Sequence, residues 1–140
     1  MSDPFDLQRF VTAQEDVYAG VAEELRRGVK TSHWMWFIFP QMKGLGHSGM
    51  AERFGIGSRA EATAYAGHAV LGPRLVECTA LVNRIEGRSA AEIFGAIDRL
   101  KFRSSMTLFA AVTDNPVFPQ ALNKFYQGEA DPLTLELLRG

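Results

Sequence analysis

Residues 30–46 have the sequence Lys-Thr-Ser-His-Trp-Met-Trp-Phe-Ile-Phe-Pro-Gln-Met-Lys-Gly-Leu-Gly and contain the longest apolar run of the chain, Trp34 to Phe39. Six consecutive apolar side chains, both tryptophans among them, would form a large adhesive patch at the surface, so we expect this run to be buried. Burial requires hydrogen-bond partners for the imidazole of His33, for two indole N–H groups and for the amide of Gln41. Either the core or a bound ligand supplies these partners.

The conformation of residues 31–41 stays open from the sequence, because periodicity does not separate a buried helix from a buried strand. Strand-favouring residues gather only at 34–39, and no segment shows a clean alternation of polar and apolar residues. A single strand would have no partner. We therefore predict an all-α fold, one compact domain over residues 1–140 with about seven short helices.

Glycine, proline and capping residues divide the rest of the chain into helical segments. Asp3-Pro4 begins the first segment and Gly28 ends it, with a break near Gln14-Glu15 where the apolar stripe thins. Ser58 and Ser89 each precede a glutamate by three residues, the pattern of a capping box. The predicted helices that follow are 59–66, one with Pro73 in its first turn that runs to Glu86, 90–94, 99–112 with Asp98 as its cap, Asn115-Pro116 to Gly128, and a last one from Asp131-Pro132.

Composition favours a soluble cytoplasmic protein and excludes several functional classes. A net charge of −1 does not resemble the basic footprint of a nucleic-acid binder. The acidic N-terminus has no signal-peptide pattern, and no apolar run is long enough for a membrane span. One cysteine excludes an intrachain disulfide, and the three dispersed histidines predict no metal site and no cofactor.

Residues 30–46 supply two groups of residues that could bind a ligand or take part in catalysis. His33 beside Trp34 and Trp36 suits a general base, or a ligand contact with a stacked ring, and Lys30, Thr31 and Ser32 ahead of it suit an anion. A core segment with an internally satisfied histidine explains the same residues. The backbone of Gly44 and Gly46, with Ser48 after it, can cradle a phosphate, although a plain turn fits equally well.

The third group is Asp98-Arg-Leu-Lys-Phe-Arg-Ser-Ser105. On a helix, Lys101, Ser104 and Ser105 lie one turn apart on a single face, and Asp98 lies a turn before Lys101. A lysine with two hydroxyls can bind an oxyanion, and a serine beside a lysine can be a nucleophile. By themselves these residues fit a solvated polar face better than a site, with one weak Asp–Lys pair, because charged helix faces are usually surface.

A family resemblance extends over nearly the whole chain. It is carried by Ser32 to Gln41, Gly44 to Gly46, Ser48, Glu61-Ala62, Tyr65, His68 to Gly72, Arg74-Leu75, Phe94-Gly95, Asp98, Lys101, Ser104 to Phe109, Phe118, Leu122, Gly128, Asp131 and Thr134. In these residues the chain resembles the bacterial family catalogued as domain of unknown function 1810. The resemblance implies a compact all-helical domain and no particular activity. Members are sometimes labelled calpastatin, but an inhibitor of that kind would be long, repetitive and disordered, unlike this chain.

The resemblance also joins the three groups into one predicted site. The first hypothesis is a pocket for a small anionic ligand, a nucleotide or nucleotide-sugar derivative, with hydrolysis as the simplest reaction if the protein is an enzyme. His33 and Asp98 are its acid–base candidates. The alternative is a non-catalytic interaction module whose polar residues lock the helices together. The ligand-binding residues of the first hypothesis are Trp34, Trp36, Gln41, Gly44, Gly46, Ser48, Lys101, Ser104 and Ser105.

Overall fold

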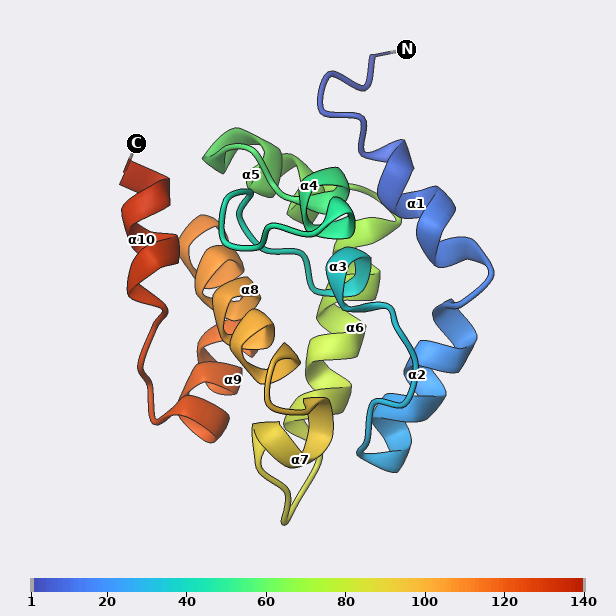
Figure 1. The fold of residues 1–140 in the computed structure, drawn as a ribbon, viewed down its shortest axis with the longest axis vertical. Helices are drawn as coiled ribbons and strands as arrows, with labels where there is room; N and C mark the ends of the chain where they lie inside the picture. The colour runs from blue at the N-terminus through green and yellow to red at the C-terminus, as the bar shows by residue number, and fades with distance from the viewer. Residues whose placement is uncertain (1, 140) are drawn as a thin grey trace.

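Ten helices follow one another along residues 2–139, the part of the chain that the computed structural model describes (Figure 1). No β-strand occurs in these residues, and Met42 and Ile56 form one isolated parallel bridge. The all-α prediction is confirmed, with three short helices, α3, α4 and α7, beyond the seven that have eight residues or more. The helices are α1 (Gln8–Glu15), α2 (Tyr18–Arg27), α3 (Met35–Ile38), α4 (Gly49–Phe54), α5 (Arg59–Gly67), α6 (Leu71–Asn83), α7 (Ala90–Phe94), α8 (Asp98–Val112), α9 (Val117–Tyr126) and α10 (Pro132–Arg139).

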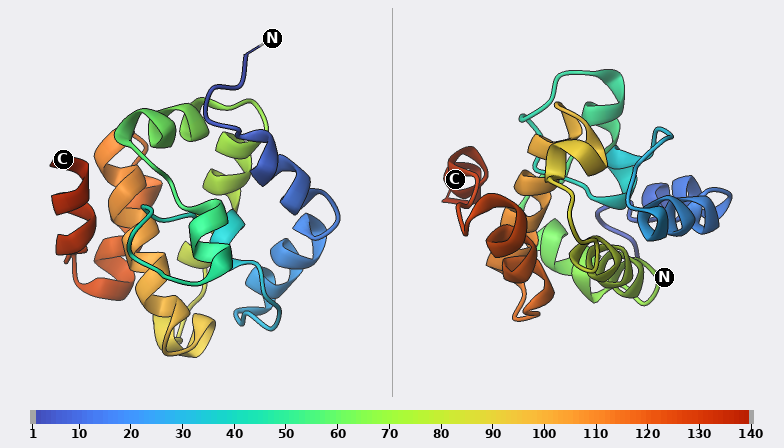
Figure 2. Two further views of the ribbon diagram at one scale, coloured as in Figure 1. Left: turned by 45° about the horizontal axis from the view of Figure 1, so that its top comes forward. Right: turned by 90° about the horizontal axis from the view of Figure 1, so that it is seen from below.

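Helices α6 and α8 organise the packing. Helix α6 contacts α2, α5 and α9, and α8 contacts α5, α7, α9 and α10. All three views place α1 and α2 on one side of the molecule and α9 and α10 on the opposite side (Figures 1 and 2). The short helix α3 lies between these sides and contacts α1, α4, α6 and α8. Within residues 2–139, no helix has both the length and the apolar character that crossing a bilayer requires.

The apolar run at residues 34–39 lies in the core, as predicted. Five of its six side chains are buried, and Trp36 is the half-buried exception. The ring of Phe39 meets that of Phe102 edge-on, with centroids 4.9 Å apart, and Phe102 stacks on Phe94 at 4.7 Å. The run forms one helical turn, α3, which ends before Pro40 because a proline disfavours helical backbone at the residue preceding it.

The first helical segment differs from its prediction at its start. Helix α1 begins at Gln8 rather than beside Pro4, after Asp6 takes a left-handed conformation with φ 52°. The carboxylate of Asp3 still acts as a cap, because it accepts the N–H groups of Leu7 and Gln8. The predicted break is confirmed between α1 and α2, and Gly28 ends α2 with φ 84°.

One of the two predicted capping boxes is modified by tertiary contacts. Ser89 and Glu92 form a complete capping box. At α5 only half of the box forms, because the carboxylate of Glu61 turns to the N–H of Gly57 and to Arg9.

Two other helices differ from their predictions at one end. Helix α6 begins at Leu71, with Pro73 in its first turn as predicted and the Nδ1 of His68 accepting the N–H groups of Val70 and Leu71, but it ends at Asn83 rather than Glu86. Helix α8 includes Asp98 as its first residue, so the prediction of Asp98 as its cap was wrong. The Asp98 carboxylate instead pairs with lysines.

Candidate functional site

One carboxylate fixes the segment that leads into α3. Glu24 of α2 accepts the backbone N–H groups of Thr31 at 2.7 Å and Ser32 at 3.0 Å, the hydroxyl of Ser32, and the indole N–H of Trp34 at 2.9 Å. Burial raises the pKa of Glu24, but these hydrogen bonds outweigh it and hold the pKa at about 2. The core therefore satisfies Trp34, and the backbone and hydroxyl donors expected to face an anion are bound to Glu24.

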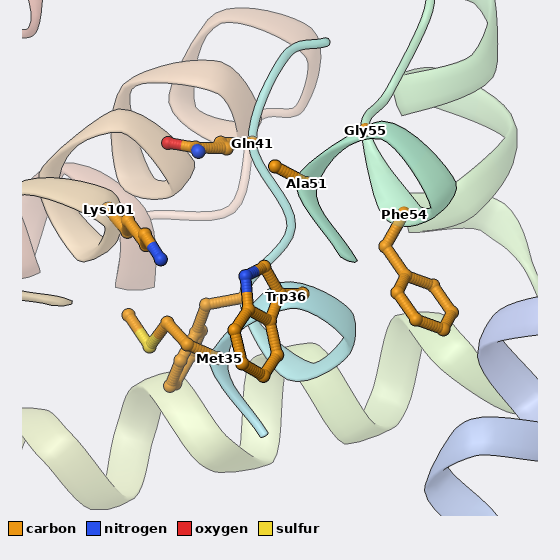
Figure 3. A pocket seen from close by; sticks show the side chains of 8 residues that line it. Met35, Trp36, Gln41, Ala51, Phe54, Gly55 and Lys101 are labelled. Atoms are coloured by element: carbon orange, nitrogen blue, oxygen red, sulfur yellow. The ribbon is translucent and has the colours of Figure 1, made fainter. Parts of the chain in front are cut away.

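Trp36 has no comparable partner. Its Nε1 atom is buried and makes no hydrogen bond to the residues that the structure describes. The ring lines a cavity of about 10 Å³, which we call the inner cavity (Figure 3). That volume holds about one water molecule or one ligand oxygen. The inner cavity is lined by Met35, Trp36, Phe39, Gln41, Ala51, Phe54, Gly55 and Lys101.

Polar groups of Lys101 and Gln41 complete the inner cavity. The ammonium of Lys101 lies 5.2 Å from the ring centroid of Trp36, and the two side-chain nitrogens point toward one another (Figure 3). The side-chain amide of Gln41 is also part of the cavity lining. An indole N–H and an ammonium donate but never accept, so the cavity favours an acceptor atom.

Two lysines share one carboxylate at this end of α8. Lys30 Nζ lies 2.9 Å from Oδ2 of Asp98, and Lys101 Nζ lies 3.6 Å from Oδ1. The side chain of Lys30 is only 8% exposed, whereas that of Lys101 is 22% exposed. Because two ammonium groups meet one carboxylate, this cluster keeps a net positive charge, and Lys101 is its accessible member.

A larger hollow lies beside the inner cavity, between α8, the segment before α10 and the loop at 41–46. It has a volume of about 320 Å³, within the range of small-ligand sites, and we call it the outer groove. Gln41 and Lys101 line both hollows and so stand between them. The outer groove is lined by Gln41, Leu45, Gly46, Ile97, Leu100, Lys101, Arg103, Ser104, Asp131 and Leu133.

The structure brings five of the predicted site residues together. Gln41, Gly46, Lys101 and Ser104 line the outer groove, and Trp36 lines the inner cavity. The hydroxyl of Ser104 already donates to a carboxylate in the segment before α10, at 3.0 Å. Ser104 therefore lines the groove, but its hydroxyl proton is already used in a hydrogen bond within the protein.

Other predicted site residues lie elsewhere. His33 is exposed and lines neither hollow. Ser105 is buried, its hydroxyl has no hydrogen-bond partner in the described part of the chain, and it also lines neither hollow. Ser48 caps α4 by accepting a backbone N–H at 3.1 Å, and Gly44 lines an adjoining groove beside α10.

Two features of the site have little signal in the sequence. Lys30 pairs with Asp98 across 68 positions of the chain, so local spacing does not reveal it. The apolar wall of the outer groove contains Ile97, Leu100 and Leu133, which helical periodicity does not separate from core residues. Ile97 is 71% exposed, an unusual position for an isoleucine without a partner.

Comparisons with known proteins agree on a family and give no activity. A family model described as "Protein of unknown function (DUF1810)" matches residues 4–138. The chain is similar to a solved structure, the conserved hypothetical protein Rv1873 from Mycobacterium tuberculosis, with 58% sequence identity and a TM-score of 0.97. The match covers 99% of each chain. No curated protein matches the sequence.

Proposed function

The chain belongs to the DUF1810 family of proteins of unknown function, and from the geometry of its site we propose that it binds a small anionic ligand in the outer groove. The position of Lys101 carries this proposal. Its ammonium lies on the groove wall and shares Asp98 with Lys30, so one positive charge of the cluster has no carboxylate of its own. An incoming anion at this wall gains a charge-assisted hydrogen bond.

The remaining walls indicate the kind of ligand. Ile97, Leu100 and Leu133 offer apolar area to a ring or another flat body. A nucleotide or nucleotide-sugar derivative combines such a body with an anionic group, and it is the first class to test. Hydrolysis comes second, with Asp98, which pairs with Lys101 of the groove wall, as its acid–base candidate.

One observation favours the alternative, a non-catalytic interaction module. Ile97, Leu100, Leu133 and Leu137 are all exposed, and three of them line the outer groove. Exposed apolar side chains that gather in one place are typical of a protein-binding surface. A ligand screen separates the two proposals, since only the first needs Lys101.

The test is a thermal-shift screen with nucleotides, nucleotide sugars, sugar phosphates and organic acids, followed by calorimetry on each hit. A ligand at one hundred times its dissociation constant stabilises the native state by about 2.7 kcal/mol. We expect Lys101→Met to lose most of this shift and Lys43→Met, which removes an exposed lysine outside both hollows, to keep it. Equal shifts in the two variants, or no shift with any compound, would overturn the proposal.

A further inference from the structure

The unpartnered N–H of Trp36 narrows the ligand class further, and this step rests on the function proposed above. We infer that the inner cavity receives one terminal oxygen of the bound anion, so that the ligand carries a carboxylate or a phosphomonoester at one end. Gln41 and Lys101 line both the inner cavity and the outer groove. The two hollows together would then form one site.

The chemistry of the inner cavity favours an anionic oxygen. A buried N–H without a partner costs about 1–3 kcal/mol, so a group that accepts from Trp36 recovers this energy on binding. The ammonium of Lys101 faces the same space and strengthens such a bond by its charge. Since neither group can accept a hydrogen bond, the incoming atom must accept one. A hydroxyl oxygen can also accept, but an anionic oxygen gains in addition the attraction to the ammonium charge.

The size of the inner cavity selects between kinds of phosphate. A space of about 10 Å³ admits one oxygen and excludes a whole phosphoryl group. A terminal phosphate or carboxylate has one covalent attachment, and it can therefore enter end-on between Gln41 and Lys101. The internal diphosphate of a nucleotide sugar carries substituents on both sides, which would collide with these two walls. Nucleoside monophosphates, sugar phosphates and carboxylic acids therefore fit, and nucleotide sugars do not.

The neighbouring tryptophan provides a control within the same molecule. The chain has two tryptophans, and the indole N–H of Trp34 is already bound to Glu24 at 2.9 Å. Nitrogen-15 NMR resolves one indole N–H signal for each, and Trp34→Phe and Trp36→Phe assign them. A new hydrogen bond should move only the Trp36 proton signal downfield.

The experiment titrates the wild-type protein with AMP as the phosphomonoester, benzoate as the carboxylate and UDP-glucose as the internal diphosphate. We expect AMP or benzoate to move the Trp36 indole signal and to leave that of Trp34 in place, and the more effective of the two identifies the anionic group. UDP-glucose should leave both signals unchanged. Trp36→Phe should weaken binding of the effective probe by about ten- to a hundredfold.

The outcomes separate this inference from the proposed function. If a probe binds through Lys101 while the Trp36 signal stays in place, or if UDP-glucose moves it equally, the inference fails and anion binding stands. If a crystal structure of the complex shows a water molecule in the inner cavity, the cavity is a hydration site only, and the inference fails as well. If none of the screened anions binds, both fail.

Discussion

The indole nitrogen of Trp34 lies 2.9 Å from Oε1 of Glu24, a residue ten positions earlier in the chain. Two residues further on, the indole nitrogen of Trp36 is buried with no partner among residues 2–139. Both rings belong to one apolar run, yet the core satisfies only the first. A buried donor left unsatisfied by its own protein is unusual and calls for a specific explanation. This difference separates the structural part of the run from the part that faces the proposed site.

The Glu24 carboxylate should stabilise the fold in a pH-dependent way. Its pKa in the folded state is about 2, below the ordinary value of 4.5, so its contribution is complete above about pH 5 and disappears as the pH falls toward 2. We expect Glu24→Gln to lower the free energy of unfolding by about 2 kcal/mol at pH 7 and by much less at pH 3. Urea unfolding at both pH values measures this difference.

Glu23 is the matched control for Glu24. It is an exposed acid on the same helix, and its ion-pair partners among residues 2–139 are Arg26 and Arg27. Glu23→Gln should change stability by less than about 0.5 kcal/mol, because exposed ion pairs contribute little. If Glu24→Gln behaved like Glu23→Gln at pH 7, the assignment of Glu24 as the anchor of the segment would be wrong.

The lysine pair at Asp98 should show coupled effects on stability. Asp98→Asn leaves two ammonium groups facing each other, one of them on the buried Lys30, and should cost about 2–3 kcal/mol. Adding Lys30→Met to this variant removes the buried unpaired charge and should restore part of that loss. Denaturant midpoints of the two single variants and the double variant complete a thermodynamic cycle. A double variant less stable than Asp98→Asn alone would contradict this account.

The fold class was predictable because its signals are local. The capping box at Ser89, the glycine that ends α2 and the proline after α3 each act through neighbouring residues. The errors arise where distant residues intervene. Arg9 lies 52 positions before Glu61 and takes its carboxylate, so the second capping box forms only in part.

The site was predictable only in part for the same reason. Lys101 and Gln41 were predicted from a helix face and from the edge of the apolar run, and both line the hollows. His33, like Gln41, stands at the edge of the apolar run, but it is exposed to solvent. One turn of helix does not determine which way the residues on either side of it point. The pairing of Lys30 with Asp98 depends on how α7 and α8 pack against the segment before α3. The spacing of residues in the sequence does not predict that packing.

Two glycines should respond to alanine in opposite directions. A Cβ at Gly72 would lie 2.3 Å from the carbonyl oxygen of Ala66, so α5 and α6 must separate, at a cost of about 1–3 kcal/mol. A Cβ at Gly20 would meet nothing within 4 Å. Since Gly20 lies inside α2, Gly20→Ala should stabilise the protein by about 0.5–1 kcal/mol. Thermal unfolding tests both variants, and the expectation fails if their melting temperatures shift in the same direction.

Gln14 should be the most sensitive polar residue of the core. It is 1% exposed, and its Nε2 donates to the carbonyl of Phe37 at 2.7 Å and to the hydroxyl of Tyr65 at 3.2 Å. Its Oε1 accepts from Arg74 at 3.3 Å, so one amide joins α1 to α3, α5 and α6.

Gln14→Leu keeps a similar volume but removes every one of these bonds, and it should cost about 2–3 kcal/mol. Tyr65→Phe is the milder comparison, because the amide of Gln14 still reaches the carbonyl of Phe37, and it should cost about 1 kcal/mol. Urea unfolding of both variants gives the two values. If Gln14→Leu were as stable as the wild type, the apolar contacts of α1 would suffice without the amide, and α1 would be held to α3 by packing alone.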